Sequence, residues 1–166
     1  MSTVISIGNQ DFESIRKSKS FYIDKTAFIK EWWENNDSVT LITRPRRFGK
    51  TLNLSTLHCF FSVKYKGRSD LFENLSIWKE KKYRDLQGTY PVIFLSFASV
   101  KGITYESARE SILLLLEELY QQHSFLLEKG ILNPKETEYF QKVGTEMSDA
   151  EAAMAIPKLA YHLFQY

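Results

Sequence analysis

The sequence lacks most features of secreted and membrane-spanning proteins. Its 166 residues include a single cysteine, Cys59, so no disulfide can form within the chain. The N-terminal stretch MSTVISIGNQDF has no basic region followed by an apolar one, and no apolar run reaches the ~18 residues of a membrane span. We therefore expect a cytoplasmic protein without membrane contact.

Charge of one sign is also scarce. The 22 Lys and Arg residues are balanced by 20 Asp and Glu, which leaves a net charge of +2 and confines any basic surface to a local patch.

Candidate metal ligands and nucleophile patterns are missing as well. His58, His123 and His162 lie far apart in the sequence, and no serine has a partnered His and Asp at a recognisable spacing. Neither a histidine metal centre nor a serine-hydrolase site is expected.

The composition itself is typical of a globular domain, with 43% hydrophobic and 25% charged residues. There is no internal repeat or low-complexity linker, so we expect one domain. Two runs have the length of strands, SVTLITR at 38–44 and PVIFLSF at 91–97. The second is nearly all apolar, which is typical of a parallel sheet covered on both faces. The expected fold class is therefore α/β, a parallel sheet flanked by helices.

Helical spacing of apolar residues predicts most of the remaining structure. A short helix is expected within 11–18, and Asp24 is predicted to cap a helix that ends near Asn35. The segment KTLNLSTLHCFF, residues 50–61, reads as a helix that directly follows a loop. Its buried face is expected to comprise Leu54, Leu57 and Phe61.

The C-terminal half reads as helical throughout. Thr104 is predicted to cap a long helix that ends at Gly130, and Ser148 with Glu151 forms a capping-box pattern. Pro157 predicts either a kink in the last helix or a restart. The buried stripe of the long helix is expected to comprise Ala108, Ile112, Leu115, Leu116 and Leu119.

The stretch TLITRPRRFGKTLNL, residues 40–54, ends like a phosphate-binding loop. Gly49, Lys50 and Thr51 fit the end of the pattern Gly, four residues, Gly-Lys-Ser/Thr, while Arg44 stands where the first glycine is usual. Pro45 biases Arg44 toward an extended conformation that needs no glycine. Lys50 would reach the β- and γ-phosphates, and the Thr51 hydroxyl would join the Mg²⁺ shell. The order strand, loop, helix supports this interpretation.

The string ITRPRRFGKTLNLSTL, preceded by FYIDKTAFI and followed by LFENLSIW and YPVIFLSF, closely resembles the N-terminal part of the bacterial AAA-ATPase-like family. The likeness covers nearly the whole chain. The family's arginine-rich string has an arginine at the position of Arg44, so the missing first glycine is typical of the family. The resemblance implies that residues 1–166 are the N-terminal part of a single P-loop domain that binds ATP and Mg²⁺, with Thr51 on the metal. The residues implied to contact the nucleotide phosphates are Arg46, Arg47, Phe48, Gly49, Lys50, Thr51 and Leu52.

Two further implications of the resemblance concern other parts of such proteins. Asp24 and Lys25 match the family's Asp-Lys-Thr segment, although we favour the simpler interpretation of a helix cap and a solvated lysine. Longer members carry a C-terminal nuclease-like domain of the PD-(D/E)xK type. Only through such a domain would we expect contact with nucleic acid.

A strand ending in Asp-Glu, the Walker B element that holds Mg²⁺ in this family, has no counterpart in the sequence. Glu117 and Glu118 are adjacent, but they lie inside a predicted helix and read as a solvated face. We therefore expect the central strand of the sheet to be absent and no catalytic residue in this chain. It would bind ATP but hydrolyse it poorly, and the incomplete sheet would allow self-association.

A non-enzymatic binding module is the alternative. In that case the basic loop Arg44–Arg47 would contact nucleic-acid phosphates or a partner protein instead of a nucleotide. Mg²⁺-dependent binding of ATP separates the two interpretations.

Overall fold

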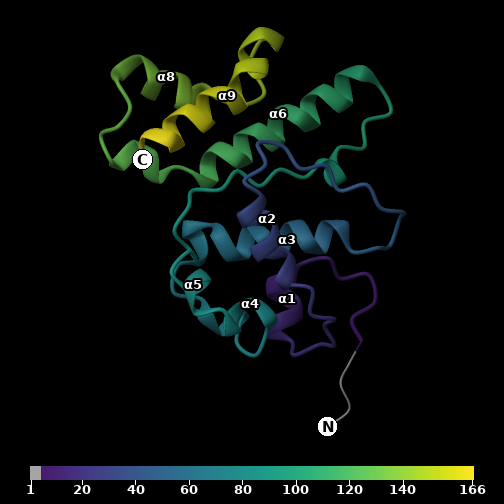
Figure 1. The fold of residues 1–166 in the computed structure, drawn as a ribbon. Coiled ribbons are helices and arrows are strands. Elements are labelled where there is room, and N and C mark those ends of the chain that lie inside the picture. The colour runs from purple at the N-terminus through teal and green to yellow at the C-terminus, as the bar shows by residue number, and fades with distance from the viewer. Residues whose placement is uncertain (1–4) are drawn as a thin grey trace. The chain divides into compact units, whose positions relative to one another are not determined.

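Helices make up the regular structure of residues 5–166 in the computed structural model (Figure 1). The chain divides into two compact units, the first ending at Val92 and the second running from Ile93 to Tyr166. The first unit contains α1 (Phe12–Lys17), α2 (Ala27–Asn35), α3 (Lys50–Phe61), α4 (Ser76–Lys79), α5 (Lys81–Arg84) and the short 3₁₀ turns Val63–Tyr65 and Ser69–Leu71. The second contains the 3₁₀ turn Phe97–Ser99, α6 (Tyr105–Gln122), α7 (Phe125–Glu128), α8 (Pro134–Lys142) and α9 (Asp149–Gln165).

The predicted parallel sheet is wrong. Residues 5–166 contain no strand, and their one β-type pairing is an isolated parallel bridge between Ser62 and Tyr90. The expected strand segments 38–44 and 91–97 are irregular, apart from the 3₁₀ turn that begins at Phe97. A run of apolar residues predicts that the segment is buried. A strand also needs a neighbouring strand that hydrogen-bonds to its backbone N–H and C=O groups. The apolar side chains of the second segment do pack, with Ile93 and Leu95 against the core of the second unit.

The core of the first unit is rich in aromatic rings. Phe12 of α1 stacks on Phe72 with ring centroids 5.2 Å apart, and Phe60 of α3 meets Phe72 edge-on at 5.1 Å. All three side chains are fully buried. Burial of rings this size contributes roughly 1.5–3 kcal/mol each. The short helix α1, predicted from the sequence, is thereby held against α3.

Helix α3 has the predicted bounds but presents a different face to the core. Of the predicted apolar face, Phe61 is buried while Leu54 is 47% exposed. Small polar residues face inward instead, and the Ser55 hydroxyl accepts the Phe12 N–H at 3.0 Å. Thr56 is also buried and donates its hydroxyl hydrogen to the Leu52 carbonyl at 2.8 Å. Where another segment of the chain packs closely against a helix, the helix buries small side chains there. The spacing of apolar residues does not predict this face.

The prediction that Asp24 caps α2 is wrong, because Thr26 is the N-cap residue. The Asp24 carboxylate accepts the Thr26 N–H at 2.9 Å and the Ser76 N–H at 2.7 Å. Burial alone would raise the pKa of Asp24, but hydrogen bonds from Ser76 and Thr26 hold it below the ordinary value. Asp24 therefore joins the start of α2 to the start of α4.

The second unit follows the sequence-based expectations more closely. Thr104 caps α6, and Ser148 with Glu151 forms the predicted capping box at α9. The long helix ends at Gln122 and not at Gly130, because α7 forms a separate turn after His123. The buried residues of α6 are Leu113, Leu116, Leu119 and Tyr120, so Leu116 and Leu119 were predicted correctly while Ile112 is 38% exposed.

Pro157 lies inside α9, which continues through it. Proline removes one backbone hydrogen bond within a helix.

No helix in the described part of the chain is both long and apolar enough to cross a membrane. Met1–Val4, the start of the segment predicted to carry no export signal, lie outside the described residues.

Candidate functional site

The loop between α2 and α3 ends in a sharp backbone turn. Gly49, the N-cap residue of α3, has φ 74° and ψ 20°, and Arg47 has φ 71°. Positive φ is uncommon for a residue with a side chain and natural for glycine. The turn lets α3 begin at Lys50, so the glycine expected from the sequence has a clear conformational role.

The N-terminus of α3 is not capped by the protein. Gly49 offers no side chain, the first turn contains no acidic residue, and the N–H groups of Lys50, Thr51 and Leu52 have no hydrogen-bond acceptor among residues 5–166. A helix start carries a partial positive charge and unpaired N–H groups, which together attract anions. Other helices satisfy these groups with side chains, namely those of Asp11, Thr104, Asn133 and Ser148.

The Lys50 side chain folds back over the loop. Its ammonium group donates to the carbonyl oxygens of Arg44 and Pro45, the latter at 2.9 Å. Both acceptors are neutral and belong to exposed residues. An anionic oxygen forms a stronger hydrogen bond with an ammonium group than a neutral carbonyl does. Lys50 is therefore held within the loop by contacts with neutral acceptors.

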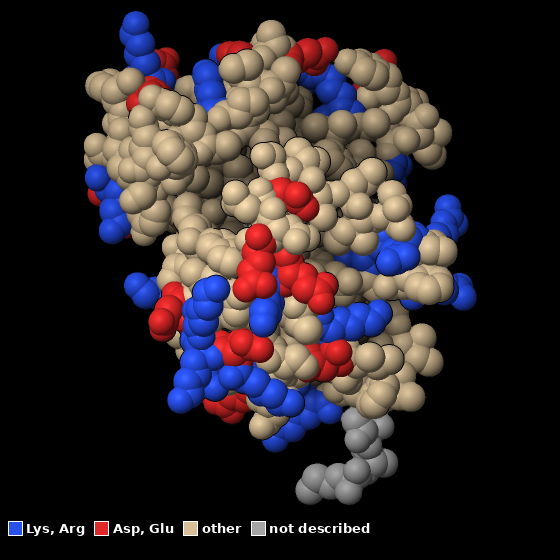
Figure 2. Space-filling view, in the orientation of Figure 1, with Lys and Arg blue, Asp and Glu red and all other residues tan. Residues whose placement is uncertain are grey.

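Positive charge is concentrated on this loop. Four cations, Arg44, Arg46, Arg47 and Lys50, fall within seven residues, and none of them is in an ion pair within the described part of the chain. Figure 2 shows Lys and Arg side chains gathered along the edge on which this loop lies in Figure 1, whereas basic and acidic side chains intermingle over α4 and α5. The sequence-wide net charge of +2 conceals this local excess.

The remaining predicted site residues differ in exposure. Thr51 is exposed and its hydroxyl has no hydrogen-bond partner in residues 5–166, while Leu52 is half-buried and packs against the core of the first unit. Phe48 is 59% exposed. Leu52 therefore anchors the first turn of α3, and Thr51 presents its hydroxyl to solvent. That the backbone carbonyls of Arg44 and Pro45 hold Lys50 could not be predicted from the sequence, because every residue has a carbonyl.

Residues 38–52, the part of the loop next to α3 and the first turn of α3, contain no Asp or Glu. Within residues 5–166 no three His, Cys, Asp or Glu side chains are grouped closely enough to hold a metal ion. Any Mg²⁺ bound here would take the Thr51 hydroxyl together with oxygens of the ligand and water. The donor set fits an ion that arrives with a phosphate group.

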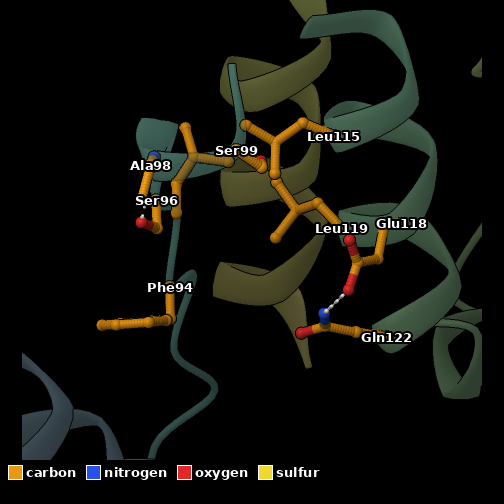
Figure 3. A pocket seen from close by; sticks show the side chains of 9 residues that line it. Phe94, Ser96, Ala98, Ser99, Leu115, Glu118, Leu119 and Gln122 are labelled. Carbon is orange, nitrogen blue, oxygen red and sulfur yellow. Dashed lines mark hydrogen bonds between the residues drawn. The ribbon is translucent and has the colours of Figure 1, made fainter. Parts of the chain in front are cut away.

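A cavity of about 320 Å³ in the second unit has a different character. It lies between residues 94–99 and α6, where Leu115 and Leu119 form part of its wall (Figure 3). Its polar residues include Glu118 and Gln122, which are hydrogen-bonded to each other at 3.4 Å. The lining contains no Lys or Arg. It therefore lacks the positive charge that the α2–α3 loop carries.

Comparison with known proteins gives one family. The model of the AAA-ATPase-like family, described as predicted AAA-ATPase, matches residues 6–157. The chain is also 36% identical over 94 residues to an uncharacterized protein in the vnfD 5′ region of Azotobacter chroococcum mcd 1. That match covers 56% of this chain and 17% of the relative, so the chain spans less than a fifth of that curated protein. No solved structure matches.

Proposed function

Because this chain belongs to the AAA-ATPase-like family, we propose that its α2–α3 loop and the first turn of α3 bind the phosphates of ATP together with Mg²⁺. The observation that carries the proposal is the uncapped start of α3 within a group of cations that have no ion-pair partner in residues 5–166. A triphosphate supplies both the acceptors and the negative charge that this region lacks.

The backbone is proposed to hold the β-phosphate. The N–H groups of Lys50, Thr51 and Leu52 belong to the uncapped first turn of α3, and Gly49 permits the backbone turn that precedes it. Lys50 would exchange its two carbonyl acceptors for β- and γ-phosphate oxygens. A charge-assisted hydrogen bond contributes roughly 1.5–3 kcal/mol net. The exchange is favourable because a neutral acceptor is replaced by a charged one.

The side chains around the turn have distinct proposed roles. The Thr51 hydroxyl, which is exposed in the first turn of α3, would coordinate Mg²⁺. Arg46 and Arg47 add positive charge beside the phosphates, and Phe48 and Leu52 contribute backbone N–H groups. Mg²⁺ held there would neutralise part of the phosphate charge.

Binding and turnover are separate claims. The sequence has no apolar run ending in Asp-Glu, the pair that the family resemblance assigns to Mg²⁺ and the attacking water. We therefore propose that these 166 residues bind ATP and release phosphate from it only slowly. A nuclease-like domain in longer relatives remains a prediction of the resemblance, as does self-association of this chain.

Titration of the chain with ATP, with and without Mg²⁺, tests the proposal. Lys50→Ala is expected to weaken binding by at least about tenfold, because it removes the charge-assisted bonds. Lys101→Ala is the matched control, since Lys101 is an exposed lysine of the second unit that forms no ion pair within residues 5–166. Equal affinity of wild type and Lys50→Ala would contradict the proposal.

The rival binding module has its own signature. If the loop recognises nucleic-acid phosphate, the chain should bind DNA with an affinity that falls steeply with salt, and ATP should not compete. That result would replace nucleotide binding as the function of the loop.

A further inference from the structure

The loop between α2 and α3 is held by few contacts of its own. Residues 38–48 form no backbone–backbone hydrogen bond among residues 5–166. No side chain of this segment is part of the core of the described first unit, and Val39, Leu41 and Phe48 are exposed. Figure 1 shows the loop running out beyond the start of α3 and returning to it. Its path therefore depends on hydrogen bonds from side chains outside the segment.

Trp32 of α2 ties the beginning of the loop. Its indole N–H donates to the Thr40 hydroxyl at 3.1 Å. The Trp32 ring in turn packs against the buried ring of Phe61, with ring centroids 5.6 Å apart. This first tie is thus anchored in the core of the first unit.

Lys50 ties the end of the loop. Its ammonium group reaches back to the carbonyl oxygens of Arg44 and Pro45, the latter 2.9 Å from the Nζ atom. Between these carbonyls and α3, Arg47 and Gly49 both have positive φ. A residue with a side chain keeps such a conformation only where surrounding contacts support it. No other hydrogen bond reaches this turn before Gly49 in the described chain, so Lys50 supplies that support.

Lys50 has too few N–H donors to keep both carbonyl contacts and also bind a triphosphate. An ammonium group has three donors, and Lys50 directs two of them to carbonyl oxygens. Contact with one β-phosphate and one γ-phosphate oxygen needs two donors, so at least one carbonyl has to be released. The charged acceptors form the stronger hydrogen bonds. Phosphate binding and the carbonyl contacts therefore compete for the same ammonium group.

We propose that Lys50 acts as a strap, formed by its two hydrogen bonds to Arg44 and Pro45, that closes the end of the loop in the ligand-free chain and is released by ATP. Thr40 keeps its hydrogen bond with Trp32 in both states. The loop thus changes next to α3 and stays fixed next to α2. The release rests on the nucleotide binding proposed above, whereas the strap in the ligand-free chain does not.

Carbonyl ¹³C resonances of the ligand-free chain test the strap. Lys50→Met removes the ammonium group and retains an unbranched side chain. The carbonyl resonances of Arg44 and Pro45 should move upfield in this variant, because a hydrogen bond shifts a carbonyl carbon downfield. Unchanged resonances in a variant that thermal unfolding shows to be folded would overturn the strap.

Limited cleavage by trypsin gives a second measurement without nucleotide. Cleavage after Arg46 and Arg47 should be at least about fivefold faster in Lys50→Met, because the loss of hydrogen bonds raises the fraction of open loop. Lys64→Met is the matched control, since Lys64 is an exposed lysine of the same unit outside the loop. Equal cleavage rates of the two variants would contradict the strap.

Addition of Mg²⁺-ATP tests the release. In the wild type, the carbonyl resonance of Arg44 or Pro45 should move toward its value in ligand-free Lys50→Met. Trp32→Phe, which keeps a ring but removes the indole N–H, should show the same movement, because the tie at Thr40 is separate.

The outcomes distinguish the release from nucleotide binding itself. If ATP binds and neither carbonyl resonance moves in that direction, the release is wrong although nucleotide binding stands. If ATP does not bind, the proposed function fails and the release fails with it. In that case the ligand-free comparisons alone decide whether the strap exists.

Discussion

The first turns of α3 and α9 differ in whether side chains of the protein satisfy their backbone N–H groups. At α9 the Ser148 hydroxyl accepts the Glu151 N–H at 3.3 Å, and the Glu151 carboxylate accepts the Ser148 N–H at 2.9 Å. At α3 no side chain caps the helix, and the basic loop adds positive charge to the positive end of the helix dipole. A helix start closed by its own side chains contributes to stability, whereas an open one retains its capacity for an external anion.

Adding an acid to the first turn of α3 should reduce the difference between the two helices, with the largest effect on binding. Thr51→Glu places in the first turn of α3 an acid of the kind found in the first turns of α1, α6, α8 and α9. ATP affinity should fall by at least about tenfold because like charges repel, while the free energy of unfolding rises by about 0.3–1 kcal/mol. Calorimetric titration and urea unfolding measure the two quantities.

Thr51→Gln controls for the size of the new side chain. This variant should lose the Mg²⁺-dependent part of ATP binding without repelling the phosphates. Its ATP affinity should therefore lie between those of wild type and Thr51→Glu. If Thr51→Glu binds ATP as well as Thr51→Gln does, the first turn of α3 does not face the phosphates.

Opening α9 should affect stability and not nucleotide binding. Ser148→Ala removes the side-chain cap and should lower the free energy of unfolding by about 1 kcal/mol. Thr51→Ala, at the uncapped helix, should change it by less than about 0.5 kcal/mol, because the Thr51 hydroxyl has no partner in residues 5–166. Urea unfolding of both variants gives the comparison, and a similar loss for each would show that α3 is capped after all.

The smallest effect is a pH dependence at the start of α9, which the start of α3 lacks because its first turn contains no acidic residue. The hydrogen bond from Lys142, together with the Ser148 N–H and hydroxyl, lowers the pKa of Glu151 to about 2. Since this pKa lies below the ordinary value of 4.5, its stabilising contribution is present above about pH 4.5 and is lost as pH falls toward 2.

Comparison of Glu151→Gln with wild type isolates that titration. The difference in melting temperature should be largest near about pH 6 and should diminish toward about pH 2.5. A difference that stays constant over this range would mean that the Glu151 charge does not contribute to the cap.

Local signals in the sequence predicted the starts of three helices correctly, whereas the predicted cap at Asp24, the helix end at Gly130 and the pairing of distant segments were wrong. Ser148 with Glu151, Thr104, and the start of α3 after Gly49 were all placed correctly, because caps and left-handed turns depend on a few neighbouring residues. The strands at 38–44 and 91–97 were wrong, because apolar residues signal burial without specifying a backbone partner.

The buried face of α3 and the position of Lys50 show a second limit. Ser55 and Thr56 face the core because α1 approaches α3 closely, and spacing of apolar residues points to Leu54 instead. The candidate site is a continuous stretch of sequence, so its residues could be named in advance. The contact of Lys50 with backbone carbonyls could not, since it depends on the path of the loop.

The most direct test of nucleotide binding at α3 is the response of its first amide groups to Mg²⁺-ATP. The amide resonances of Gly49, Lys50, Thr51 and Leu52 should undergo the largest shifts in the ¹⁵N spectrum, and those of Asp149 and Glu151 at the capped start of α9 should not move. In Lys50→Ala the same shifts should require at least about tenfold more nucleotide. Binding of ATP that leaves these four amides unchanged would contradict the account.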